Sequence, residues 1–141
     1  MSQAEINLQI VVPTQNRYLN LVGSIAELLI RKLEGHQGCG ESLACDLNLV
    51  LTEGVANAIR HAGPARPTET VRVHLDIEGD NLRVRIFDHG PGFDLEQVPA
   101  PDFDGQEESG RGLFLIRALM DSVDYRKTEA GNVLEMWKKL S

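Results

Sequence analysis

The chain has 141 residues, of which 42% are hydrophobic and 25% are charged, and its net charge is −7. These values are ordinary for one soluble globular domain, and the acidic charge disfavours nucleic-acid binding because phosphate contacts need a basic surface. No stretch is apolar for long enough to cross a bilayer and the first residues do not form a secretion signal, so we expect a cytoplasmic protein that does not enter the membrane.

A strand and two helices are predicted for the first half of the chain. Alternating apolar residues over 7–12 predict the strand, which Pro13 ends. Thr14 is expected to cap the first helix, which runs to about residue 34. The second helix is expected over about residues 42–62. The apolar stripe of the first helix is formed by four side chains: Leu21, Ile25, Leu28 and Leu29.

Two β-hairpins and a third helix are predicted for the second half. Strict alternation over 71–78 and again over 82–86 predicts an antiparallel hairpin with one wet face and one buried face. Residues 90–109 are rich in acidic residues and contain no Lys or Arg, which is typical of a mobile loop. A helix over 110–120 is expected to lead into a closing hairpin over 122–138.

The predicted order of elements is strand, helix, helix, strand, strand, loop, helix, strand, strand. Helices that cover one face of a mixed, mostly antiparallel sheet form a two-layer α/β sandwich. We therefore expect one such domain over residues 1–141, with the loop over 90–109 as a lid.

Three polar residues interrupt the apolar pattern of the second predicted helix: Glu53, Asn57 and His61. Their spacing of four residues stacks them on one side of the helix, about 6 Å apart along its axis. One interpretation is a solvated helix face, because charged residues mostly contact water. The other is a site, in which a carboxylate acts as a base and an amide oxygen one turn later ligates a hard cation.

A glycine pair follows Asp88, which stands at the end of a predicted strand. Gly90 and Gly92 let the backbone turn tightly or approach a ligand closely. A turn capped by the aspartate is the alternative interpretation of the same motif.

A second glycine pair opens the third predicted helix in the string Gly110-Arg111-Gly112-Leu113. Backbone amides at a helix start form a favourable site for phosphates. A flexible helix entry is the alternative, and the motif is not a P-loop because no Gly-Lys-Ser/Thr follows.

The three motifs in this order resemble the N, G1 and G2 boxes of the GHKL ATPase superfamily, which includes histidine kinases, gyrase and MutL. The match covers about residues 42–125. The strings 51–61 and 110–121 are very similar to the anti-sigma-factor serine kinases of the switch-protein family, and this resemblance covers nearly the whole chain. A compact chain without a helical dimerisation domain or a transducer domain fits that family better than a sensor histidine kinase or gyrase.

The resemblance implies a Bergerat ATP-binding fold that binds ATP with Mg2+. Asp88 would accept a hydrogen bond from the adenine amino group, Asn57 would ligate Mg2+, and Glu53 would be the catalytic base for a substrate serine. The other implied nucleotide-binding positions are Gly90 and Gly92 at the pocket floor and lid hinge, Gly110, Arg111 and Gly112 near the phosphates, and Leu113.

The resemblance also implies partners. The substrate would be an anti-anti-sigma protein with a STAS domain, the second partner a sigma factor or another switch target, and the kinase a homodimer. Two alternatives stay open: an ATP-binding regulatory module without catalysis, and a histidine-kinase catalytic domain that works in trans. The chain departs from many relatives at Asn132, where they carry threonines near the adenine, and in the predicted lid, which has no cation.

Overall fold

The computed structural model describes residues 5–34, 39–61, 69–89, 108–129 and 131–140. Three helices and five strands follow one another in the predicted order, with a short 3-10 turn before the first helix. The strands are β1 (Glu5–Pro13), β2 (Thr70–Glu78), β3 (Asn81–Asp88), β4 (Ser122–Thr128) and β5 (Gly131–Lys139). The helical elements are η1 (Asn16–Tyr18), α1 (Leu19–Glu34), α2 (Cys39–His61) and α3 (Glu108–Leu119).

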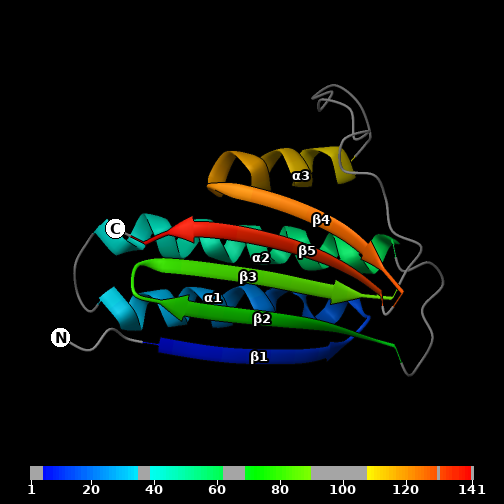
Figure 1. Cartoon of the computed structure of the whole chain (residues 1–141), viewed down its shortest axis with the longest axis horizontal. Coiled ribbons are helices and arrows are strands. Elements are labelled where there is room, and N and C mark those ends of the chain that lie inside the picture. Colours follow the sequence, from blue (N-terminus) through cyan, green and yellow to red (C-terminus); the bar gives the residue numbers. More distant parts are fainter. Residues whose placement is uncertain (1–4, 35–38, 62–68, 90–107, 130, 141) are drawn as a thin grey trace.

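The five strands form one sheet in the order β1-β2-β3-β5-β4, and the helices lie on one side of it (Figure 1). This arrangement confirms the predicted two-layer α/β sandwich. All four pairings between described strands are antiparallel, so this sheet is antiparallel rather than mixed. Short hairpins, such as the turn at Gly79 with its φ of 60°, allow only antiparallel neighbours.

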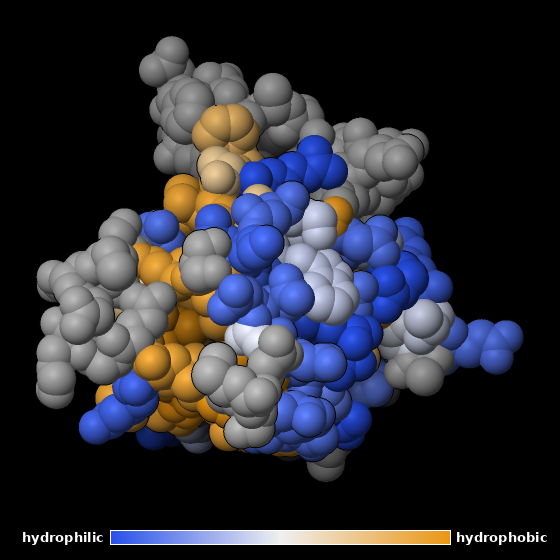
Figure 2. Space-filling view, turned by 60° about the vertical axis from the view of Figure 1, so that its left-hand side comes forward, coloured by the Kyte–Doolittle hydropathy of each residue, from blue (hydrophilic) through white to orange (hydrophobic). Residues whose placement is uncertain are grey.

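The core lies between the inner face of the sheet and the helices. Alternate residues of the two central hairpin strands point into it and are at most 2% exposed: Val71, Val73, Leu75, Ile77, Leu82, Val84 and Ile86. The predicted alternation over 71–78 and 82–86 is therefore confirmed. The opposite face carries polar side chains, and Figure 2 shows hydrophilic residues covering that side of the molecule.

The face that the first helix turns to the core agrees only in part with the predicted stripe. Ile25 and Leu29 of that stripe pack against the core, whereas Leu21 and Leu28 are 49% and 57% exposed. The fully buried side chains of this helix are those of Val22, Ala26 and Ile30. The reason lies next to Val22. A Cβ atom on Gly23 would collide with the side chains of Asn48 and Thr52, so this face of α1 is the one that can approach α2 closely.

The start of the helical segment also differs from the prediction. The N-cap residue of η1 is Gln15, and no side chain caps it. Thr14, the predicted cap, is buried, and its backbone N–H donates to the carbonyl of Glu69 over 3.1 Å. Thr14 thus ties the end of β1 to the segment before β2 instead of starting a helix.

Helix α2 approaches the sheet closely at Gly54. A Cβ atom there would lie only 2.5 Å from Cδ1 of Ile86 on β3. Glycine therefore allows a close approach that a larger residue would prevent. Because Ile86 is two residues before Asp88, this contact sets the polar residues of α2 near the end of β3.

Candidate functional site

The three motif-bearing segments meet at one end of the sheet. In Figure 1 the last turns of α2, the end of β3 and the first turn of α3 lie at the same end of the molecule, opposite the C-terminus. Gly90 and Gly92 lie outside the described residues, and so do the side chains of His61 and Arg111. The site can therefore be built from Glu53, Asn57, Asp88 and the backbone of α3.

The side chain of Asn57 is only 1% exposed, so the interpretation of this position as part of a solvated helix face is wrong. Its Oδ1 atom accepts a hydrogen bond from Arg60 over 3.2 Å. Its Nδ2 atom is buried and has no hydrogen-bond partner among the described residues. A buried amide without a partner costs about 1–3 kcal/mol. Such a group in a folded protein calls for an explanation, and a ligand-binding role provides one.

Arg60 is a residue that sequence reasoning missed. It lies three positions after Asn57, on the same side of α2, and its side chain is exposed. The spacing alone could have indicated it, since the predicted lid contains no cation and Arg60 is the nearest basic residue to Asn57 in the sequence. Its contact with Oδ1 shows that this oxygen attracts positive charge.

Glu53 lies one turn before Asn57 and is half-buried. Its carboxylate is adjacent to α3, because a Cβ atom on Gly112 would lie 2.6 Å from Oε2 of Glu53. The structure thus brings together two residues that are 59 positions apart in the sequence. A carboxylate at this position is available to a group that approaches from the surface of the molecule.

Asp88 is 6% exposed at the end of β3. The register of β3 and β5 places Asn132 directly opposite, and its Nδ2 donates to Oδ1 of Asp88 over 2.9 Å. Next to it, Gly131 has φ 135°, and a Cβ atom there would lie 2.6 Å from the Asp88 carbonyl oxygen. Only glycine fits this conformation and this contact.

A hollow of about 260 Å³ opens beside this pair. It reaches Asp88 and Asn132. Arg72, Phe87 and Val133 also line it, and they belong to the sheet face that points away from the helices. The hollow therefore lies on the other side of Asp88 from Glu53 and Asn57. It marks the end of the sheet at which the site lies, without being the space between these residues.

Two predicted positions on α3 have a different setting from the one expected. The helix begins at Glu108, so Gly110 lies in its first turn and Gly112 in its second. Only the first four N–H groups of a helix lack an intrahelical partner, and the amide of Gly110 is one of these, whereas that of Gly112 lies one residue beyond them. The phosphate contacts expected of both glycines stay predictions. Leu113 is 2% exposed, and its side chain packs in the hydrophobic core.

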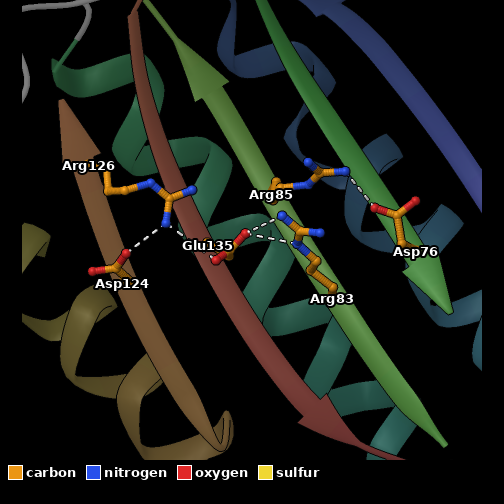
Figure 3. A network of polar contacts seen from close by, with 6 residues as sticks. All are labelled: Asp76, Arg83, Arg85, Asp124, Arg126 and Glu135. Carbon is orange, nitrogen blue, oxygen red and sulfur yellow. Dashed lines mark hydrogen bonds and ion pairs between the residues drawn. The ribbon is translucent and has the colours of Figure 1, made fainter. Parts of the chain in front are cut away.

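A separate polar network covers the outer face of the sheet (Figure 3). Glu135 accepts from Arg83 over 2.8 Å and from Arg126 over 3.4 Å, and Arg126 also pairs with Asp124. Burial alone would raise the pKa of Glu135, but the hydrogen bonds from the two arginines outweigh it and hold that pKa below its ordinary value. The network joins three strands on the face opposite the helices, so it belongs to the scaffold.

Two features are not found in the described part of the chain: a membrane-spanning helix and a cluster of metal ligands. None of the helices there is apolar over a membrane-spanning length. No three His, Cys, Asp or Glu side chains there come together as metal ligands.

Comparisons with known proteins agree with this architecture. The family model described as a histidine kinase-like ATPase domain matches residues 18–138. A relative named serine-protein kinase RsbW, from Listeria innocua, is 30% identical over 138 residues, which cover 92% of this chain and 84% of the relative. The relative with the same name from Oceanobacillus iheyensis is 28% identical over 124 residues, 82% of this chain and 76% of the relative.

Solved structures show the same fold at low identity. The crystal structure of the SiaB-SiaC complex from Pseudomonas aeruginosa contains a chain that matches with a TM-score of 0.62 and 14% identity, over 93% of this chain and 88% of that one. The histidine kinase domain of a blue-light activated histidine kinase from Erythrobacter litoralis matches with a TM-score of 0.56 and 19% identity. That match covers 92% of this chain and 62% of the other.

Proposed function

Since the chain belongs to the histidine kinase-like ATPase domain family, we propose that it is an ATP-dependent protein-serine kinase of a partner-switching circuit. Its substrate is a STAS-domain anti-anti-sigma protein, and its second partner is a sigma factor or another switch target. It acts in the cytoplasm as a homodimer. The relatives named serine-protein kinase support the activity, and the matched chain of the SiaB-SiaC complex supports a protein partner.

One observation carries the proposal. Glu53 lies one helical turn before the buried Asn57, at the end of the sheet where Asp88 is buried. A base, a cation ligand and an acceptor for an amino group are the three functions that this family's motifs imply, and the elements that carry the corresponding residues lie at one end of the sheet.

The residues present fit ATP with Mg2+. Among the described residues the Nδ2 atom of Asn57 has no hydrogen-bond partner, and its Oδ1 atom already attracts a guanidinium group, so the amide can serve a cation on one side and a phosphate oxygen on the other. The carboxylate of Asp88 accepts N–H donors, as its bond with Asn132 illustrates, and an adenine amino group is a donor of the same kind. The Gly110 amide, at the start of α3, suits phosphate.

The chemistry divides between ligand and protein. When bound, ATP with Mg2+ supplies the phosphoryl group and neutralises much of its charge. Glu53 takes the proton of the substrate serine hydroxyl, and the half-buried position of its carboxylate limits its contact with water. Asp88 and Asn57 fix the base and the phosphates so that the serine meets Glu53 in a productive geometry.

Two measurements test the proposal. Calorimetric titration with ATP, with and without Mg2+, should show Mg2+-dependent binding that Asp88→Asn and Asn57→Ala both weaken. Incubation with ATP and STAS-domain proteins of the same organism should give an acid-stable phosphoserine, and Glu53→Gln should abolish it while ATP still binds. Acid-labile phosphate would indicate phosphohistidine, and a partner that binds without gaining mass would indicate a regulatory module. Either outcome overturns the kinase proposal.

A further inference from the structure

The hollow beside Asp88 lies on the outer face of the sheet, and the hairpin of β4 and β5 keeps it open. Gly131 stands opposite Thr128 in this hairpin and lines the hollow without a side chain. A side chain is excluded there, because φ is 135° and a Cβ atom would lie 2.6 Å from the Asp88 carbonyl oxygen. The space of about 260 Å³ is therefore a consequence of how the strands pair.

Arg72, which borders this space, has a charge that the described residues do not neutralise. Three other arginines of the outer face, Arg83, Arg85 and Arg126, each pair with a carboxylate over 2.8 Å (Figure 3). The side chain of Arg72 forms no ion pair or hydrogen bond within the described part of the chain. A guanidinium group matches the geometry of carboxylate and phosphate groups, so Arg72 is available to an anion.

The other lining residues suit a ligand that is only partly charged. Phe87 lies directly opposite Arg72, and Val133 lies on the other side of Phe87. These two side chains offer an apolar surface beside the guanidinium group. Thr70 and His89 also line the hollow, and a hydroxyl and an imidazole can each donate a hydrogen bond to an oxygen atom.

We propose that the hollow binds a small organic anion, whose carboxylate or phosphate group pairs with Arg72 while a flat apolar group packs on Phe87 and Val133. The volume lies just below the range of about 300–1,000 Å³ that is usual for ligand pockets, which favours a small molecule over a whole nucleotide. Asp88, the acidic residue of the lining, accepts a hydrogen bond from Asn132, and both belong to the inward-pointing register of their strands. This site is separate from ATP binding and does not rest on the proposed function.

The first experiment is an NMR titration of the isotope-labelled full chain, without nucleotide, with phenylphosphonate. This probe carries a doubly ionisable phosphonate group and one aromatic ring. The backbone amide signals of Arg72, Phe87 and Val133 should shift to saturation with a Kd of about 1 mM or below, while those of Glu53 and Asn57 stay in place. Methylphosphonate lacks the ring and should bind at least about fivefold more weakly.

The second experiment removes the cation. Arg72→Ala should weaken phenylphosphonate binding at least about tenfold, since hydrogen bonds to charged groups are strong, and Arg72→Lys should give an intermediate affinity. The matched control is Arg83→Ala, which removes the same charge from the same face, four residues and about 13 Å along β3 from Phe87. At physiological salt this exceeds the screening length of about 8 Å, so the control should change the affinity less than twofold. An unchanged Tm of Arg72→Ala would show that this variant folds.

Four results would overturn the inference. They are no saturation by about 10 mM phenylphosphonate, an unchanged affinity in Arg72→Ala, equal binding of both phosphonates, which would indicate an adventitious ion only, and shifts centred on Glu53 and Asn57, which would place the probe among the nucleotide-binding residues. A wild type that binds phenylphosphonate as expected but binds no ATP would contradict the proposed function and leave this site intact.

Discussion

Replacement of Asn132 by alanine tests whether this residue orients Asp88 for the adenine. The substitution removes a hydrogen bond of 2.9 Å that is buried on both sides and ends on a carboxylate. Hydrogen bonds to charged groups contribute about 1.5–3 kcal/mol, so we expect the free energy of unfolding to fall by about that amount. Asn81→Ala is the matched control, because Asn81 is exposed at the far end of β3, and it should change stability by less than about 0.5 kcal/mol.

The decisive assay compares two nucleotides. Calorimetry should show that the wild type binds ATP about tenfold or more tightly than purine riboside triphosphate, which lacks the amino group that Asp88 would recognise. In Asn132→Ala this preference should shrink, whereas Asn132→Thr, which keeps a donor, should retain most of it. The reasoning is refuted if Asn132→Ala weakens both nucleotides equally, since Asn132 would then support the fold without orienting the base.

Three further predictions concern other parts of the molecule. The pKa of Glu135 lies below its ordinary value of 4.5, so the contribution of this group to stability is present above that pH and is lost as the pH falls through the lowered pKa. Glu135→Gln removes the titrating carboxylate. In urea titrations of this variant, the unfolding free energy should therefore fall less steeply between about pH 5 and 3 than in the wild type. Arg60→Ala removes a cation next to Asn57, so calorimetry should show weaker ATP binding at low salt and a smaller difference at high salt, and an unchanged salt dependence would contradict it. Gly54→Ala should lower the unfolding free energy by about 1–2 kcal/mol in denaturant titrations, because overpacking against Ile86 exceeds the helical gain, and an unchanged midpoint would contradict that.

The sequence was sufficient to predict the hairpin of β2 and β3, because the information for it is local. The alternation in β2 and β3 follows directly from side chains that point to opposite faces, and the hairpin turn at Gly79 fixes the register. The apolar stripe of α1 was predicted correctly for Ile25 and Leu29 and wrongly for the exposed Leu21 and Leu28, because two faces of this helix are apolar. The close approach at Gly23 decides between them, and it depends on residues 25 and more positions away.

In the candidate site, too, some features could be predicted from the sequence and others depend on residues that are far apart in it. The order of motifs predicted that Glu53, Asn57 and Asp88 serve one site, and the fold brings their elements to one end of the sheet. The spacing of three residues could have indicated the contact of Arg60 with Asn57. The contact of Asn132 with Asp88 could not be predicted, because composition and spacing do not say which polar groups of different strands end up within hydrogen-bonding distance of each other.

Two glycines explain how Glu53 is held in place. Gly54 lets α2 approach the sheet, which fixes the helix that carries Glu53, and Gly112 lets α3 approach the carboxylate itself. The carboxylate is therefore bounded by α3 before any substrate arrives. If Glu53 is the base that the proposed function assigns to it, the substrate serine would have to come to a group whose position is set by helix packing. Selection of a substrate would then depend on how a partner docks beside α2 and α3, and substitutions at either glycine should affect phosphotransfer to every partner alike.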